Sequence, residues 1–465
     1  MTQIQDKEPS EEYSFRRDDP EAGNQIVGLL ETNQHPQLDQ LLEELYDADV
    51  AYILQHLDFE QMERLFLRLP AERRGLVLLE LDDPIKQELL ESLTPRQVAE
   101  IVQEQESDAA ADIMEDLPEE TSGEVISLLP QEDRQEVTEL LSYPENTAGA
   151  LMMKEFAVVL ETSTVKQAIK SIRRATSEAD DIYTVYVVDA EGKYKGHIGL
   201  DRLILASSRT RIKKITETEI LPIPVTTDRE EVAQIFTRYN FLSAPVVDAN
   251  DVMVGRITAD AILEVVEEEA SEDILRMGGV SGDETLSSPV ISSAMKRNLW
   301  LSVNLLTAFL ASSVVSLFGE TIEKVVILAS LMPIVAGMGG NAASQTMAVI
   351  IRNIALGELS PSGLPRAILR EGVMGSMNGL IQGFATGLFV FLFTHKLVLA
   401  GVITAAMIAN MLIAATAGTA IPLILKRFGI DPAVASSIFV TTFTDVCGFM
   451  SFLGLARLML PWLMN

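Results

Sequence analysis

The sequence predicts a multidomain membrane protein that joins an α-helical superhelix, a tandem pair of α+β units and an all-α membrane domain with five transmembrane helices. Three observations support this fold class. Short amphipathic segments separated by prolines come first, a strand–turn–strand–helix pattern then occurs twice, and five long apolar segments follow Lys296. The boundaries that we predict are a disordered tail at 1–22, the superhelix at 23–148, the two α+β units at 149–210 and 211–270, a connecting helix at 271–295 and the membrane domain at 296–465.

Charge is distributed unevenly along the chain. Residues 1–295 contain 26 Lys and Arg against 61 Asp and Glu, a net charge of −35, whereas residues 296–465 contain 10 against 6, a net charge of +4. A strongly acidic surface repels nucleic acid and attracts metal cations, although acidity can also serve solubility alone. We therefore expect divalent cations, and no nucleic acid, among the partners.

The superhelix is predicted from prolines that interrupt residues 58–144 about every 12 residues, with one interruption skipped. Segments such as LPAERRGLVLLEL (69–81) and LPQEDRQEVTELL (129–141) each place a proline at the first turn, then acids, then an apolar stripe. Helices this short cannot bury their stripes alone, so we expect them to stack. The polar, acidic start MTQIQDKEPSEEYSF does not resemble a secretory signal, and the single cysteine, Cys447, is consistent with a reducing compartment.

The two α+β units are predicted from a duplicated pattern. YTVYVVDAEGKYKGHIGL (183–200) reads as two strands joined by a turn, and SAPVVDANDVMVGRI (243–257) repeats it about 60 residues later, each followed by a helix. This duplication resembles tandem cystathionine-β-synthase-type (CBS) domains, regulatory units that often bind adenine nucleotides. The nucleotide-binding form usually carries Thr/Ser-x-x-Asp between strand and helix. Here the matching segments end in Arg202 and Ala261, which argues against ATP binding.

The membrane domain is predicted from apolar segments near or above the length of about 20 residues that crosses a bilayer. The predicted spans are 298–318, 325–350, 372–393, 397–425 and 434–458. Basic residues precede the first span, occupy the connection between the second and third, and follow the fourth. By the positive-inside rule these positions and the acidic N-terminal module are cytoplasmic, and the C-terminus is outside.

The last span contains a single acidic residue, Asp445, in the otherwise uncharged stretch FVTTFTDVCGFMSF (439–452). A carboxylate within a membrane span is costly and is functional by default, although it can simply be hydrogen-bonded to neighbouring threonines. Thr441 lies one turn before Asp445 and Gly448 almost one turn after, which gives one face a narrow polar stripe. Such a stripe suits Mg²⁺, which prefers oxygen ligands and holds its waters tightly.

The second span contains PIVAGMGGNAASQ (333–345). Asn341 and Gln345 are spaced i, i+4 and can present amide oxygens to the ion pathway, or can simply join helices. We expect Pro333 and the glycines up to Gly340 to loosen this helix and free backbone carbonyls. The candidate pathway residues are therefore Asp445, Thr441, Gly448, Asn341, Gln345 and Gly340.

Two acidic segments are candidate metal sites. In ESDAAADIMEDL (106–117), Asp108 and Asp112 share a helix face, where like charges oppose each other and a bound cation would relieve them. The second segment, ADAILEVVEEEASEDI (259–274), leads toward the membrane. Its candidate ligands are Asp260, Glu264, Glu267, Glu268 and Glu272. For any single residue here, a solvated acidic face is the alternative.

An acidic superhelix, paired CBS domains, a connecting segment and five spans together resemble the MgtE family of magnesium channels. PIVAGMGGNAASQ and DPAVASSIFVTTFTDVCG (431–448) are similar to the family's two membrane motifs; Ala342-Ala343-Ser344 departs from it, since a glycine is often found there. The resemblance implies a homodimer in the bacterial inner membrane, with Asp445 paired across the dimer axis. It also implies an Mg²⁺-selective channel that moves Mg²⁺ down its electrochemical gradient and is closed by cytoplasmic Mg²⁺ on the acidic domains.

Two other classes stay open. One is a coupled carrier of the same fold that exchanges Mg²⁺ for another ion or moves Co²⁺ or Mn²⁺. The other is a membrane receptor that transports nothing. We do not expect an enzyme, because the sequence contains no Walker loop, no HExxH and no Cys-x-x-Cys motif.

Overall fold

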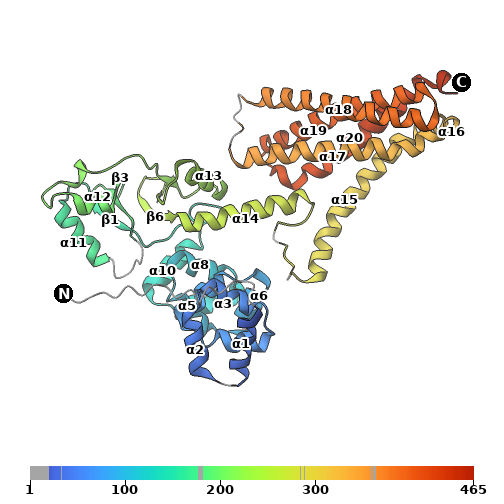
Figure 1. Ribbon diagram of the computed structural model, residues 1–465. Helices are drawn as coiled ribbons and strands as arrows, with labels where there is room; N and C mark the ends of the chain where they lie inside the picture. Colours follow the sequence, from blue (N-terminus) through green and yellow to red (C-terminus); the bar gives the residue numbers. More distant parts are fainter. Residues whose placement is uncertain are drawn as a thin grey trace. The chain divides into compact units, whose positions relative to one another are not determined.

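The computed structural model describes residues 20–32, 34–175, 182–282, 284–286, 288–357, 359 and 363–464. The predicted tail lies outside these residues up to position 19. The chain forms two units that divide after Val265, and each is described by itself (Figure 1). Helices and strands occur where the fold class requires them, which confirms that prediction.

Ten short helices form the first part of unit one. Pro70, Pro118 and Pro130 stand at the N-caps of α5, α9 and α10, where a residue without an N–H group costs least. Thr94 and Gln97 form a capping box at the start of α7. The helices are α1 (Pro20–Glu31), α2 (His35–Glu44), α3 (Asp47–Leu54), α4 (Phe59–Phe66), α5 (Ala71–Leu79), α6 (Asp83–Ser92), α7 (Pro95–Val102), α8 (Ser107–Glu115), α9 (Glu119–Leu128) and α10 (Gln131–Leu140).

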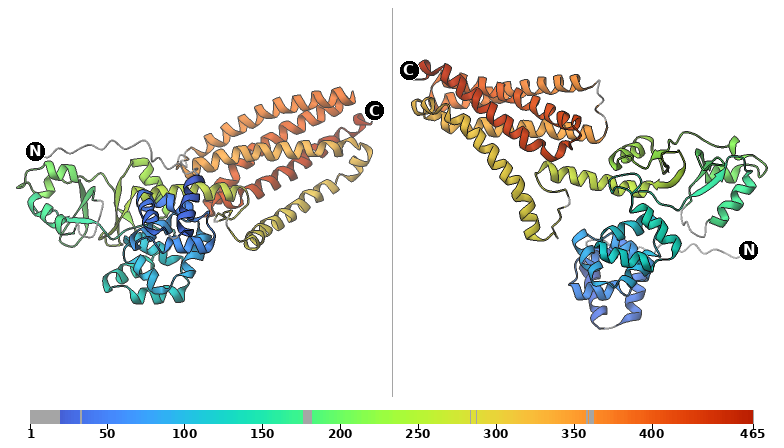
Figure 2. Two further views of the ribbon diagram at one scale, coloured as in Figure 1. Left: turned by 60° about the horizontal axis from the view of Figure 1, so that its bottom comes forward. Right: turned by 180° about the vertical axis from the view of Figure 1, so that it is seen from behind.

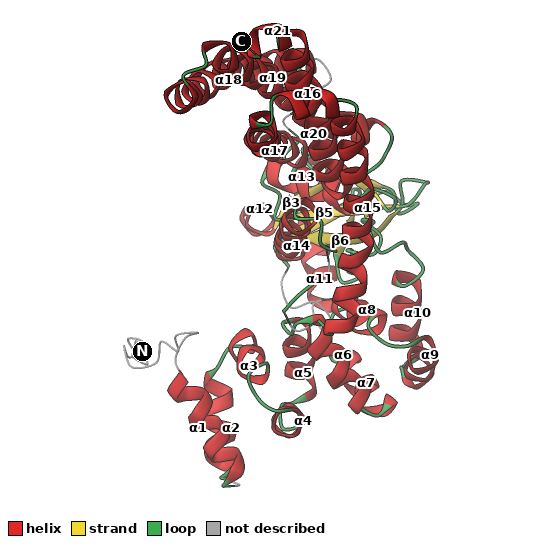
Figure 3. Cartoon of the chain, turned by 90° about the vertical axis from the view of Figure 1, so that its right-hand side faces the viewer, coloured by secondary structure: helices red, strands yellow, loops and turns green. Residues whose placement is uncertain are grey.

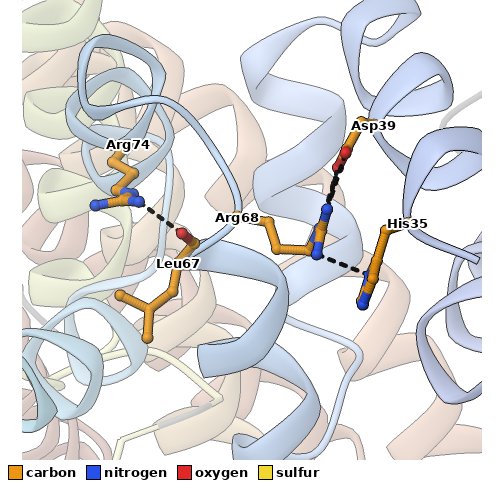
Figure 4. Close-up of polar contacts among 5 residues, drawn as sticks. All are labelled: His35, Asp39, Leu67, Arg68 and Arg74. Atoms are coloured by element: carbon orange, nitrogen blue, oxygen red, sulfur yellow. Dashed lines mark hydrogen bonds and ion pairs between the residues drawn. The ribbon is translucent and has the colours of Figure 1, made fainter. Parts of the chain in front are cut away.

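The apolar stripes of these helices meet in one continuous core. Leu38, Leu54, Phe66 and Leu89, from four different helices, are fully buried in it. Hydrogen bonds and ion pairs join neighbouring segments at the edge of this core (Figure 4). Arg68 donates to the Asp39 carboxylate at 2.8 Å and to Nδ1 of His35 at 2.7 Å. No single helix could bury its own stripe, so the stack is held by contacts between neighbours.

The tandem units each contain a three-stranded sheet, and Figure 3 shows the strands confined to these sheets. The orders are β1-β2-β3 and β4-β5-β6, with the first pair parallel and the second antiparallel in both. Tyr186 Oη and Ser243 Oγ lie 2.5 Å apart and link the two sheets. The elements are β1 (Ala157–Leu160), α11 (Val165–Ala175), β2 (Thr184–Val188), β3 (Tyr194–Gly199), α12 (Leu200–Leu205), a 3₁₀ turn (Ile212–Lys214), β4 (Ile223–Pro224), α13 (Arg229–Tyr239), β5 (Ser243–Val247), β6 (Met253–Thr258) and α14 (Ala259–Met277).

Unit two contains five helices long and apolar enough to cross a membrane (Figure 2). They are α15 (Val290–Ser316), α17 (Ile327–Ala355), α18 (Leu364–Thr394), α19 (Leu397–Arg427) and α20 (Pro432–Leu458), with the short α16 (Gly319–Lys324) and α21 (Leu460–Leu463) beside them. α18 presents Gly375, Gly379, Gly383 and Gly387 to α19. A Cβ at Gly379 would lie 2.9 Å from Cα of Ile408 on α19, so the two backbones approach closely, as small residues allow in lipid.

Candidate functional site

α20 carries Asp445 about halfway along its length, and the side chain is half-buried. Thr441 Oγ1 donates to the carbonyl oxygens of Ser437 at 2.8 Å and Ile438 at 3.2 Å. The single hydroxyl proton of Thr441 is therefore used within the helix, while the oxygen lone pairs remain free to accept hydrogen bonds from an ion's water shell. Among the described residues, no cation or hydrogen-bond donor pairs with the Asp445 carboxylate.

Gly448 is buried against Asn410 of α19. Asn410 is fully buried, and its Nδ2 donates to the carbonyl oxygen of Val335 on α17 at 2.7 Å. A Cβ at Gly448 would lie 2.8 Å from Oδ1 of Asn410, which accepts no hydrogen bond within the described chain. The amide thus joins three helices one turn from Asp445. Asn410 does not stand out in the sequence, because it lies in the apolar, Ala- and Gly-rich segment IANMLIAATAGTAIP (408–422).

α17 presents the other predicted pathway residues on its surface. Asn341 and Gln345 are exposed in the single chain, and a Cβ at Gly340 would meet nothing within 4 Å. An exposed amide face on an apolar span requires protein or water beside it, since lipid cannot satisfy it. Pro333 did not have the effect we expected: α17 runs unbroken from Ile327 to Ala355.

A cavity of about 140 Å³ lies among α17, α18 and α19. Its polar lining comes from Gln345, Thr346, Arg370, Glu371 and Asn378. Glu371, near the start of α18, is a buried acid of the membrane helices and is 4% exposed. The sequence analysis missed it because the third span was predicted to begin at residue 372, one position later; the apolar residues that follow Arg370 were the available signal.

The last turns of α14 place acids around Arg276. Its guanidinium pairs with Glu272 and with Asp431, and Asp431 caps α20 by accepting from the backbone N–H of Ala433 at 2.8 Å. Burial first, and then the Asp431 and Glu269 carboxylates, raise the pKa of Asp273 to about 6. This cluster connects the end of α14 directly to the helix that carries Asp445.

The superhelix brings further acids together on α8. Burial raises the pKa of Asp108 to about 7, and the Glu106 and Glu155 carboxylates add to the effect. The pKa of Asp112 is also raised, by desolvation and by its neighbours Asp108, Glu115 and Glu264. The structure therefore brings Asp112 of α8 near Glu264 of α14. Burial is the larger cause of both raised pKa values and the neighbouring like charges are the smaller one; a cation that binds these carboxylates would favour their charged form and so compete with the protons.

The remaining predicted ligands of α14, Asp260, Glu267 and Glu268, are exposed on the helix surface. Across the residues that the structure describes, no three His, Cys, Asp or Glu side chains form a cluster that could hold a metal ion. A site made by this chain alone would therefore rely on water and on amide, hydroxyl or backbone oxygens beside one or two carboxylates.

Comparison with known proteins gives matches along most of the chain. A family model for divalent cation transporters (MgtE) matches residues 332–455, one for the MgtE intracellular N domain matches 45–146, and CBS domain models match 148–209 and 212–268. The magnesium transporter MgtE of Thermus thermophilus is 36% identical over 320 residues, 68% of this chain and 71% of that protein. Its counterpart from Enterococcus faecalis is 33% identical over 69% and 71%.

One solved structure is similar to the cytosolic part. It is a crystal structure of the cytosolic domain of the Mg²⁺ channel MgtE in complex with ATP, 32% identical, with a TM-score of 0.50. The similarity covers 52% of this chain and 99% of that one.

Proposed function

Because the chain belongs to the MgtE family of magnesium transporters, we propose that it is an Mg²⁺ channel of the cytoplasmic membrane, closed by cytoplasmic Mg²⁺. The observation that carries the conducting role is Asp445, a half-buried carboxylate in an apolar span with no cationic partner among the described residues. Keeping such a charge is costly unless it serves an ion. Mg²⁺ would pass with much of its water shell, held by Asp445 and the oxygen of Thr441.

The pore would be completed by a second copy of the chain. One carboxylate cannot balance a divalent ion, whereas a two-fold axis beside α20 would bring two Asp445 side chains together. The exposed amides of Asn341 and Gln345 on α17 support this arrangement, since they would face the partner or the water of the pore.

Gating would use the acidic segments. Asp108 and Glu264 both oppose the ionisation of Asp112, and Mg²⁺ bound beside one or two of these carboxylates would displace protons and favour one arrangement of α14. The pairing of Arg276 with Asp431 gives that rearrangement a direct route to the start of α20. Gating by Mg²⁺ rests on this charge pattern and on the connection through α14.

ATP is a weaker candidate ligand. The cytosolic domain of the relative was crystallised with ATP, but Arg202 stands here where the nucleotide-binding form has Asp, and it pairs with Glu217 instead. Ala261 takes the second such position and has no ligating atom. Nothing in the site points to catalysis, and we propose no enzymatic activity.

The test is Mg²⁺ flux into liposomes that contain the purified chain, driven by an imposed gradient. Asp445→Asn keeps the shape of the side chain and removes its charge, so we expect a loss of flux on the scale of a lost ion site, about tenfold or more. Cys447→Ser, two residues away on the same helix, is the matched control and should conduct normally.

Each rival class has its own outcome in this assay. Uncoupled flux that disappears in Asp445→Asn supports the channel. Flux that requires a counter-ion would indicate a coupled carrier, and absence of flux in the wild type would indicate a receptor. Full flux in Asp445→Asn would remove Asp445 from the pathway.

A further inference from the structure

The first α+β unit carries a concentration of positive charge in an otherwise acidic part of the chain. Residues 161–175 and 203–214 contain eight Lys and Arg against one acid, a net charge of +7, whereas residues 1–295 as a whole have a net charge of −35. The proposed channel uses none of these bases. Seven of them have described side chains, and all seven are exposed: Lys166, Lys170, Arg173, Arg209, Arg211, Lys213 and Lys214.

The fold gathers these side chains into one basic surface. Lys166, Lys170 and Arg173 are spaced i, i+4 and i+7, so they share one face of α11. The N–H group of Lys166 donates to the carbonyl oxygen of Ser208 at 3.1 Å. This bond holds the start of α11 against the segment 208–214, which carries the other four bases. We call the seven exposed side chains together the basic surface.

Little of this charge is neutralised within the described chain. Lys213 pairs with the Glu161 carboxylate at 3.2 Å, and both groups keep contact with solvent. For the other six bases, no described carboxylate forms an ion pair. An uncompensated positive surface on a protein that is otherwise strongly acidic attracts an anionic partner.

Two exposed aliphatic side chains directly precede the second basic segment. They are Ile204 and Leu205, the last two residues of α12, and they are 66% and 85% exposed. Exposed aliphatic groups beside several bases are typical of a surface that docks on lipid headgroups. The bases attract anionic lipids, and the apolar groups enter the boundary between headgroups and acyl chains.

The second α+β unit shows that the fold itself does not require this combination. Leu263 of α14 stands where the first unit has Ile204, and it is 70% exposed. Its neighbours along the helix are the acids Asp260, Glu264 and Glu267. The same position of the duplicated pattern is therefore flanked by bases in one unit and by acids in the other.

The basic surface is also distinct from the place where the nucleotide-binding form carries its Asp. Arg202 takes that place soon after Gly199, which pairs with Thr184 at the start of β2. α11 instead follows Leu160, which pairs with Val188 at the end of β2. The two ends of this strand are about 13 Å apart. The start of α11 and its basic neighbours thus lie at the other end of the sheet.

We propose that the basic surface, with Ile204 and Leu205, docks on the anionic cytoplasmic leaflet of the membrane that the chain itself spans. An acidic protein partner would satisfy the bases but would give the two aliphatic side chains no apolar environment. Lipid provides both. The covalent link to the membrane helices keeps the surface near a bilayer, so a weak attraction is sufficient. This inference goes beyond the proposed channel and does not depend on ion conduction.

The test places a fluorescent reporter on this surface in the full chain. Ile204→Cys is introduced in a Cys447→Ser background, labelled with an NBD maleimide and reconstituted in phosphatidylcholine nanodiscs with or without phosphatidylglycerol. Docking should raise the NBD emission only where phosphatidylglycerol is present, and doxyl groups on the lipid chains should quench it. High salt should reverse the change, because it screens the charges.

Matched controls make the result specific. Leu263→Cys, the equivalent position of the second unit, should respond to neither lipid mixture. Arg209→Gln with Arg211→Gln should lower the ratio of docked to undocked chain about 25-fold, since each base near an anionic surface contributes about fivefold. Arg64→Gln with Arg96→Gln removes the same charge from exposed positions of the superhelix and should leave docking unchanged.

Equal emission in the two kinds of nanodisc would overturn the proposal, as would a response that persists in Arg209→Gln with Arg211→Gln. High emission that doxyl lipids do not quench would also overturn it, because the reporter would then be buried against protein, such as a second copy of the chain. The proposed channel fails separately. Docking in a chain without Mg²⁺ flux would leave this surface standing without the channel, and normal flux without docking would leave the channel standing alone.

Discussion

Replacing Gly448 by alanine should destabilise the membrane domain, because this glycine packs directly against the buried Asn410 amide. The added Cβ would lie 2.8 Å from Oδ1 and 3.2 Å from Cγ of Asn410. The amide cannot swing away cheaply, since its Nδ2 donates to Val335 O at 2.7 Å and its side chain is fully buried. Overpacking of this kind costs about 1–3 kcal/mol. The higher helix propensity of alanine offsets up to about 1 kcal/mol of that cost.

A double-mutant cycle isolates the contact. Asn410→Ala removes the amide and leaves space for the new methyl group, so Gly448→Ala should be neutral or stabilising in that background. The expected coupling is about 1–3 kcal/mol, the overpacking cost itself. Gly454→Ala is the matched control, because it is on the same helix and its Cβ would meet nothing within 4 Å. Gly454→Ala therefore measures only the gain in helix propensity from glycine to alanine.

The assay is the apparent melting midpoint of the purified chain. The chain is heated to a series of temperatures, and gel filtration measures how much of it stays folded. For a unit of this size, about 1 kcal/mol corresponds to about 2–4 °C. Gly448→Ala should lower the midpoint in the wild-type background only. An equal loss in both backgrounds, or a loss no larger than that of Gly454→Ala, would refute the role assigned to Asn410. Because Asp445 lies three residues from Gly448, the single variant should also lower Mg²⁺ flux.

Two further predictions concern the cytoplasmic acids. Mg²⁺ should protect residues 260–295 from protease in the purified chain. Arg276→Ala should reduce this protection because it breaks the ion pair with Asp431. Digestion at the same rate with and without Mg²⁺ would exclude the gating proposal. The second concerns pH. The raised pKa of Asp108, about 7 against an ordinary 3.8, means that the folded chain binds a proton that the unfolded chain has released. Without Mg²⁺, stability should therefore fall as pH rises from about 4 through about 7, and the stabilisation by Mg²⁺ should be larger at pH 8 than at pH 6, since proton and cation compete. Melting midpoints in EDTA and in Mg²⁺ measure both, and a Mg²⁺ effect equal at the two pH values would contradict the argument.

The sequence was sufficient to predict the architecture, because the period of apolar residues reports directly on secondary structure and on membrane spans. The prolines of the superhelix and the duplicated strand–turn–strand pattern fall where the structure has helix starts and paired sheets. What could not be predicted is which face of an apolar helix meets a neighbour. The small residues of α19 are buried, as expected of residues that let helices approach closely, but nothing in the periodicity showed that they face glycines spaced every four residues from Gly375 on α18.

The membrane sites show the same limit of sequence reasoning. Asp445 was found because it is a single charge in the middle of a span, but Asn410 and Glu371 derive their importance from burial against other helices. An Asn in an apolar segment is unremarkable until its amide is seen between Gly448 and Val335. Glu371 looked like the last residue of a polar connection, since a span boundary is uncertain by a few residues. Pro333 was expected to loosen its helix, yet α17 stays continuous although proline has no backbone N–H to donate. Neighbouring helices in a membrane can compensate for such a lost hydrogen bond.

The free energy that a gate requires sets how many cations the acids of α8 and α14 must bind together. Shifting a two-state equilibrium from 1:99 to 99:1 takes about 5.5 kcal/mol of differential binding. One cation that binds a single state at ten times its dissociation constant supplies only about 1.4 kcal/mol, so about four must act together. Asp112 with Glu264 and Asp273 with Asp431 are two separate groups of acids, and Glu264 and Asp273 stand at different points along α14. A gate built this way must be cooperative: loss of any one carboxylate weakens closure without abolishing it, whereas loss of the Arg276–Asp431 ion pair weakens the effect of every ion bound along α14 on α20.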